Sequence, residues 1–301
     1  MTDFLIEDAQ APRAIKGRSL WEDARRRLMR NPAAVVSLYV VALLVLIAVF
    51  GPMLWVHKYD EIFRESVGIA PTFENMHLLG TDTEGRDMVA RVIAGLGISL
   101  LVGACATAVS LTIGVLYGAI AGFAGGIVDD LMMRFVDVMY SIPFVFFVIV
   151  LMTVVQLDSP ELNLVLVFCA IGAVEWLTMS RIVRGQTIAL RRKEFVEAAR
   201  ASGAKPIQIV LRHIVPNVLG PVVVFATLNI PVIILAESFL SFIGLGVQET
   251  LSSLGSLLAR GMGQMQAPWM LIAPAVTMLI TLLALNFLGD GLRDALDPKE
   301  R

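Results

Sequence analysis

Long apolar runs alternate with short polar stretches along the 301 residues of this chain. A helix of about 20 apolar residues crosses a hydrocarbon core of about 30 Å, and runs of that length recur here. The pattern predicts an all-α polytopic membrane protein with six transmembrane helices. By residue number, the predicted spans are 33–56, 98–123, 138–157, 162–182, 217–240 and 268–288.

The polar stretches divide the chain into five parts. Residues 1–32 are hydrophilic, and Ser19 followed by Glu22 is a capping-box pattern that predicts a short basic surface helix. The other parts are a first span (33–56), a polar loop (57–91), a core of five spans (92–290) that includes a hydrophilic segment at 183–216, and a polar tail (291–301).

Three details of the core are also expected. Residues 92–128 hold no charged residue and are too many for one upright helix, which predicts a surface helix leading into the second span. A loop rich in Gly and Ser, at 244–267, is expected before the sixth span. A polar turn is expected before the third span, and it contains Asp129, Asp130, Arg134 and Asp137.

Four glycines in the second span, Gly114, Gly118, Gly122 and Gly126, recur every four residues. Residues four apart share one face of a helix, and small side chains let two membrane helices approach closely. The repeat predicts a tight helix seam, for example with a sister subunit. The alternative is the general enrichment of glycine in membrane helices.

Composition and charge add a membrane orientation. Charged residues make up 17% of the chain, against about 25% in soluble domains. Of the 24 Lys and Arg residues, 19 lie on the side of the two termini and of segment 183–216, which predicts that this side is cytoplasmic. No cleavage pattern precedes the first span, so it is expected to be an uncleaved anchor.

Motifs for bound cofactors and for local catalytic sites are missing from the sequence. There is no Gly-x-x-x-x-Gly-Lys-Ser/Thr, His-Glu-x-x-His or Cys-x-x-Cys. His57, His77 and His213 fall in different segments and form no obvious metal site, and Cys105 and Cys169 lie inside apolar spans. We therefore expect no enzyme activity, cofactor, metal or disulfide in this chain, and its small net charge gives no sign of nucleic-acid binding.

The hydrophilic segment contains a predicted surface helix from Glu194 to Ser202. Gly203 suits the end of that helix, and Pro206 suits the first turn of another. Helical spacing would give it a shallow face for another protein, made of Phe195, Ala198, Ala199 and Ser202. Glu197 would either cap the turn at Gly203 or pair across the interface. The alternative is a solvated linker between spans.

This segment resembles the cytoplasmic EAA loop of ATP-binding-cassette importer permeases. Glu197-Ala198-Ala199 is followed by Gly203, Ile214 and Pro216 in the order of that loop, although Val215 replaces the leucine of the usual Ile-x-Leu-Pro. The resemblance implies that Glu197, Ala198, Ala199, Gly203, Phe195 and Ser202 belong to a coupling helix that docks on a separate ATPase subunit.

Further motifs resemble the dipeptide/oligopeptide/nickel group of these permeases, and the set is most similar to the oligopeptide C subunits. It implies a type I ABC importer permease fold in the bacterial inner membrane, with both termini cytoplasmic. The motifs are Gly80-Thr81-Asp82, Gly85-Arg86-Asp87, Arg184-Gly185-Gln186-Thr187, His213-Ile214-Val215-Pro216-Asn217 and the stretches 17–21, 237–246 and 289–298.

The resemblance also implies partners. They are a homologous B-type permease, two subunits that bind ATP and Mg, a periplasmic peptide-binding protein and membrane lipid. The expected function is the import of oligopeptides. Alternatives are the same machine importing dipeptides, nickel chelates or haem, or a gradient-driven secondary transporter, which would need a relay of buried carboxylates and no EAA loop.

Ionisable and polar residues inside spans are candidates for the translocation path. Glu237 with Ser238 would line the cavity or cap the turn after the fifth span. Glu175 would tune the polarity of the pore, reach towards the cytoplasmic surface, or face Arg181 or Arg184. Prolines in the spans would act as hinges or simply shape the helices. These are Pro143, Pro221, Pro231 and Pro274.

Overall fold

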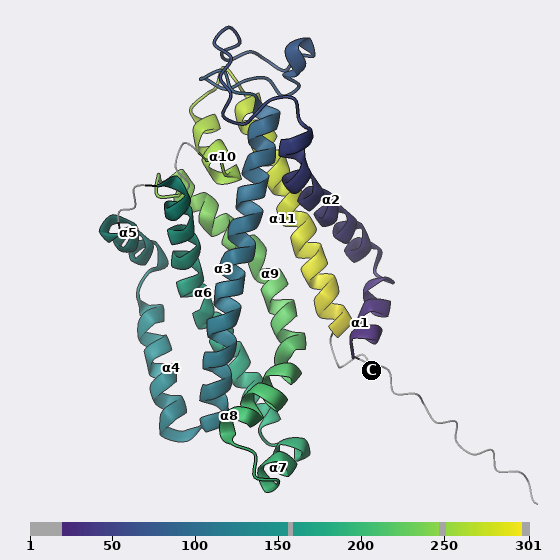
Figure 1. Ribbon diagram of the computed structural model, residues 1–301, viewed down its shortest axis with the longest axis vertical. Coiled ribbons are helices and arrows are strands. Elements are labelled where there is room, and N and C mark those ends of the chain that lie inside the picture. The colour runs from purple at the N-terminus through teal and green to yellow at the C-terminus, as the bar shows by residue number, and fades with distance from the viewer. Residues whose placement is uncertain (1–19, 156–158, 247–250, 297–301) are drawn as a thin grey trace, which may run out of the picture.

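The computed structural model describes residues 20–155, 159–246 and 251–296 as a bundle of helices joined by loops (Figure 1). The helices before the middle of the chain are α1 (Leu20–Leu28), α2 (Pro32–Leu54), the 3₁₀ helix η1 (Glu74–Met76), α3 (Met88–Ala124), α4 (Gly126–Ser141) and α5 (Phe144–Val154). Those after it are α6 (Pro160–Leu190), α7 (Glu194–Ala201), α8 (Pro206–Ile209), the π-helix η2 (Val210–Ile214), α9 (Val215–Phe242), α10 (Leu254–Met262) and α11 (Trp269–Leu296).

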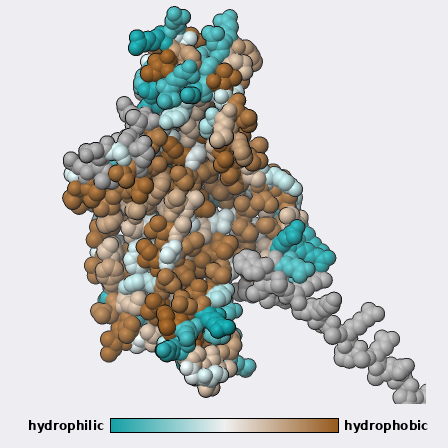
Figure 2. All heavy atoms as spheres, viewed as in Figure 1, coloured by the Kyte–Doolittle hydropathy of each residue, from teal (hydrophilic) through white to brown (hydrophobic). Residues whose placement is uncertain are grey.

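The described helices match a multi-pass membrane protein. Five are long and apolar enough to cross a membrane, and α4 with α5 makes a sixth if this bent pair counts as one span. Figure 2 shows a wide hydrophobic belt between hydrophilic residues at the top and the bottom. Helix α7, helix α1 and the last turns of α11 all lie towards the lower end in Figure 1, as an even number of spans requires.

The predicted surface helix before the second span is wrong. Helix α3 is one continuous helix of 37 residues, which begins at Met88 where the Asp87 side chain accepts a hydrogen bond from the Ala90 N–H. Its first turns contain Arg91, which is only 1% exposed. The helix continues through this charged residue because Asp82 and Ser252 bind the guanidinium in the interior.

The predicted polar turn before the third span is also wrong, because its charged residues lie in α4. Two of them pair with arginines of α6: Arg184 binds both carboxylate oxygens of Asp129 at 2.6 and 2.7 Å, and Arg181 lies 2.8 Å from Asp137. The predicted span is broken at Pro143, where α5 turns 82° away from α4. Proline has no N–H to continue the helix.

Other predicted boundaries differ in length. Helix α6 continues to Leu190 and α11 to Leu296, so the segment between the fourth and fifth spans is shorter than predicted, and the tail is partly helical. Helix α10 lies inside the predicted loop 244–267. The capping residue Ser19, most of the motif at 17–21 and the final residues 297–301 lie outside the described residues.

Three of the four repeated glycines lie in a close contact between α3 and α6 of the same chain. A Cβ added at Gly114 would stand 2.6 Å from Met179, one at Gly118 would stand 2.3 Å from the Ser180 carbonyl oxygen, and one at Gly122 would stand 2.7 Å from the Arg184 carbonyl oxygen. Gly126 lies outside this contact, because α3 ends at Ala124. The seam therefore lies within the chain and not against a sister subunit.

A Gly118→Ala substitution is expected to destabilise the bundle by about 2–3 kcal/mol, because the added methyl would overlap backbone that cannot move aside. Thermal unfolding in detergent measures the change. Gly97→Ala is the matched control on the same helix, since its Cβ would meet its nearest neighbour at an ordinary 3.6 Å. An equal melting temperature for the two variants would contradict the seam.

Candidate functional site

The segment between α6 and α9 forms the short helix α7 at one end of the bundle (Figure 1). It ends at Ala201, and the turn that follows contains Gly203, which has a φ of 79° that favours glycine. Backbone hydrogen bonds close this turn, from Ala204 N–H to Ala199 O at 3.1 Å and from Gly203 N–H to Arg200 O at 2.9 Å. The side-chain bond at this turn comes from the Ser202 hydroxyl, which donates to the Ala198 carbonyl oxygen at 2.9 Å, and the roles given to Glu197 stay predictions.

Helix α7 has a buried face and an exposed face. Val196 is fully buried and Ala199 packs beside it on the core. Glu197, Ala198 and Ser202 are exposed, and Phe195 is 40% exposed. Ala199 therefore lies on the buried face of α7 and not on the predicted outer face. What remains for a partner is a surface of small residues flanked by Phe195 and a carboxylate.

The buried face attaches α7 to the membrane helices. Val196 belongs to a hydrophobic core cluster that also contains residues of α3, α6, α8, η2 and α9. Arg200 lies over the ring of Phe123 at 5.1 Å, and Arg191 donates to the Phe123 carbonyl oxygen at 3.2 Å, at the end of α3. The packing is therefore continuous from α7 to three spanning helices, α3, α6 and α9.

Glu237 lies at the other end of α9 and is completely buried. It accepts hydrogen bonds from Ser241 at 2.6 Å and from Ser99 of α3 at 3.3 Å. Ser241 Oγ lies 3.4 Å from Ser253 Oγ, and Ser253 caps α10. Through these buried hydroxyls the carboxylate connects α3, α9 and α10.

Ser238, the other candidate at this end of α9, is also buried. Its hydroxyl lies 3.9 Å from the sulfur of Met278 in α11. A Cβ added at Gly255 of α10 would stand 2.3 Å from the Cα of Ser238, so the two helices touch at this point. The geometry makes Ser238 a packing residue between α9, α10 and α11.

Removing the Glu237 carboxylate is expected to destabilise the chain. A Glu237→Leu substitution leaves buried hydroxyls without their acceptor and should cost about 2–4 kcal/mol, whereas Glu237→Gln retains an acceptor and should cost less than about 1 kcal/mol. Thermal unfolding in detergent, together with uptake assays, tests this. Normal stability with altered uptake in Glu237→Leu would show instead that the side chain acts on the substrate.

Glu175 lies halfway along α6 and is half-buried. The predicted contact with Arg181 or Arg184 is wrong, because both arginines bind carboxylates of α4. Glu175 Oε2 instead accepts a hydrogen bond of 3.0 Å from the Asn229 side chain in the middle of α9. This carboxylate–amide pair joins the two helices deep in the membrane region.

The loop between α2 and α3 is fastened to the bundle opposite α7. Arg91 binds Asp82 and donates to Ser252 Oγ at 2.9 Å, just before α10. Trp269, the first residue of α11, donates to the Thr81 carbonyl oxygen at 3.0 Å. The loop thus packs on the ends of three helices as a fixed platform.

The sequence of this helical bundle matches two known protein families. Residues 114–301 match the family described as binding-protein-dependent transport system inner membrane component, and residues 19–71 match the N-terminal transmembrane domain of oligopeptide transport permease C. The chain belongs to the family of inner-membrane components of binding-protein-dependent transport systems. It is a multi-pass permease of the bacterial inner membrane and a transport component, not a catalytic one.

Individual permeases match over nearly the whole chain. The oligopeptide transport system permease proteins OppC of Haemophilus influenzae and Escherichia coli are each 51% identical over 297 residues, covering 98% of this chain and 93% and 97% of their own. The dipeptide transport system permease protein DppC of Bacillus subtilis is 40% identical over 94% of this chain and 87% of its own.

Several contacts in this permease could not be predicted from the sequence. Asn229 gave no signal, because one amide in an apolar span has no identifiable partner. The link between Arg91 and Ser252 joins segments far apart in sequence, and no local spacing predicts it. The same holds for His57 and His77, which the sequence separates and the structure stacks with ring centroids 4.8 Å apart.

Proposed function

We propose that this permease is a pore-forming subunit of an ATP-driven importer of oligopeptides, and that α7 couples it to the ATPase. The observation that carries the coupling role is the two-sided construction of α7, with Val196 and Ala199 anchored in the core and Ala198 exposed. The identity of about half its residues with two oligopeptide permeases supports the substrate class.

The energy must come from other subunits, since the chain has no phosphate-binding loop. We propose two ATP-binding subunits that hold ATP and Mg, a homologous B-type permease that completes the pore, and a periplasmic binding protein that delivers the peptide. Closure of the ATPases would draw the α7 helices of the two permeases together. The core shared by α3, α6, α7 and α9 would carry that displacement into the membrane.

Reconstitution tests this assignment. The chain, its B-type partner, the two ATPases and the binding protein are expected to take up a labelled oligopeptide into proteoliposomes only with hydrolysable ATP. An arm with a labelled dipeptide, a nickel chelate or haem distinguishes the other substrates of the group. Uptake that persists without the ATPases and follows an imposed ion gradient would contradict the proposal and favour a secondary transporter.

Glu175 is our proposed polar residue of the translocation path. Glu175→Gln removes the charge but retains an acceptor for Asn229, so the melting temperature should not change. Loss of a charged contact worth about 1 kcal/mol would lower oligopeptide uptake about fivefold. Asn229→Ala leaves the carboxylate but removes its donor, which separates charge from hydrogen bonding. Unchanged uptake in Glu175→Gln would assign the pair to packing alone.

A further inference from the structure

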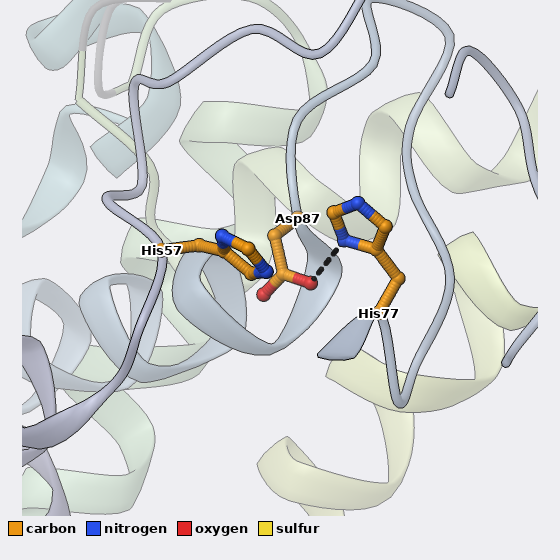
Figure 3. A group of neighbouring side chains, drawn as sticks. All are labelled: His57, His77 and Asp87. Atoms are coloured by element: carbon orange, nitrogen blue, oxygen red, sulfur yellow. Dashed lines mark hydrogen bonds and ion pairs between the residues drawn. The ribbon is translucent and has the colours of Figure 1, made fainter. Parts of the chain in front are cut away.

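Two histidines and an aspartate meet in the loop opposite α7, at the junction between α2 and α3 (Figure 3). His57 follows the end of α2, His77 follows the 3₁₀ helix η1, and Asp87 caps α3. In Figure 3 the two imidazoles flank the Asp87 carboxylate. One ligand atom from each residue lies within 4.8 Å of the others.

The carboxylate is oriented before any ligand arrives. Asp87 Oδ1 accepts from the Trp55 indole N–H at 2.9 Å and from the Ala90 N–H at 2.8 Å. Oδ2 lies 3.0 Å from His77 Nδ1. Hydrogen bonds to one carboxylate oxygen that leave the other towards the histidines are typical of the outer shell of a metal site.

The His77 ring is buried, being 1% exposed, and only one of its two nitrogens is hydrogen-bonded. Nε2 has no hydrogen-bond partner within the described residues. The Asp87 carboxylate accepts the hydrogen bond at Nδ1, so the neutral ring carries its proton there without a metal, and Nε2 can carry that proton once an ion occupies Nδ1. A metal ion can then replace the proton between Nδ1 and Oδ2.

His57 provides the third ligand and a route for entry. Its Nε2 donates to the carbonyl oxygen of Asn75 at 2.7 Å, which leaves the lone pair of Nδ1 for a metal ion. Asn75 and Met76 both have positive φ, an uncommon backbone for residues other than glycine. His57 is half-buried and lines two open cavities, of about 310 and 740 Å³, so an ion can reach it from solvent.

We propose that His57, His77 and Asp87 form a binding site for a divalent transition metal such as zinc. Two imidazoles and a carboxylate suit such an ion, whose bonds of about 2.0–2.2 Å require the ligands to close in slightly from their present separations. The bound ion fastens the end of α2 to the start of α3. The site is independent of the transported substrate. The proposal runs against the expectation, from the sequence, that the histidines form no metal site.

Metal titration of the full chain, purified with a tag free of histidine and treated with chelator, tests the site. We expect one Co²⁺ per chain with the absorption of nitrogen–oxygen coordination, displaced by Zn²⁺, and a higher melting temperature with Zn²⁺. His57→Ala should lower the affinity about tenfold or more. It leaves the bonds from His77 and Trp55 to Asp87 intact, so the variant should fold.

Two further variants make the test decisive. His77→Asn retains a donor towards Asp87 but lacks the imidazole, and it should also lose the metal. His213→Ala, at the other end of the molecule, should bind Co²⁺ as the unsubstituted chain does. Absence of stoichiometric binding to the unsubstituted chain would overturn the proposal and make the cluster a hydrogen-bonded anchor only. Equal binding by His57→Ala and His213→Ala would overturn it as adventitious binding elsewhere.

Discussion

An Ala198→Arg variant is expected to insert and fold normally but to lose ATP-driven uptake about 100-fold or more. Ala198 is exposed on α7, so a larger side chain has room among the residues that the structure describes. At a closely packed interface, however, a long cation would have to be buried without a partner, which is costly. ATP hydrolysis by the assembled complex should no longer respond to the loaded binding protein.

Ala33→Arg is the matched control for Ala198→Arg. Ala33 is exposed in the first turn of α2, on the side predicted to be cytoplasmic, where an additional cation agrees with the charge distribution. It should retain uptake and coupling. Normal transport by Ala198→Arg would mean that α7 is not the docking helix. Loss of transport by both variants would point to a general effect of added charge.

The largest effect on stability is expected at Arg91. An Arg91→Met substitution removes one member of a buried ion pair and leaves Asp82, which is 2% exposed, without its counter-charge. Breaking such a pair costs about 3–5 kcal/mol. The link to Ser252 is lost as well, so the loop should separate from α10 and become sensitive to protease. Thermal unfolding and limited proteolysis in detergent measure both effects.

Two further variants test whether the unpaired buried charge causes the loss of stability. Arg91→Met combined with Asp82→Asn should recover part of the lost stability, because no unpaired charge remains in the interior. Arg86→Met breaks the more exposed pair with Glu84 and should cost no more than about 1 kcal/mol. If the double variant is no more stable than Arg91→Met alone, the ion pair is not what fixes the loop.

The sequence predicted what depends on local pattern. Apolar length predicted five of the six spans, and the helix formers between Glu194 and Ser202 predicted α7 to within a residue of its observed end. It failed where a distant partner decides the structure. Asp129 and Asp137 looked like a polar turn because the arginines that neutralise them lie in α6. Only the folded chain shows that these charges are paired along a helix.

The candidate site also has one part set by local sequence and another part set by contacts between distant segments. The coupling segment is local, and its residues follow one another in the chain. The roles of Glu237, Glu175 and the two histidines depend on Ser99, Asn229 and Asp87, which belong to other elements. Periodicity identified the face of glycines on α3, but not the helix that packs against it.

The measurement that tests the coupling role most directly is disulfide or bifunctional cross-linking from Ala198→Cys in the assembled importer. The two natural cysteines, Cys105 and Cys169, would first be replaced by alanine to remove background. Cross-linking to the ATPase subunit from Ala198→Cys, with none from Ala33→Cys, is the predicted result. Absence of that cross-link in a complex that still transports with ATP would contradict the account.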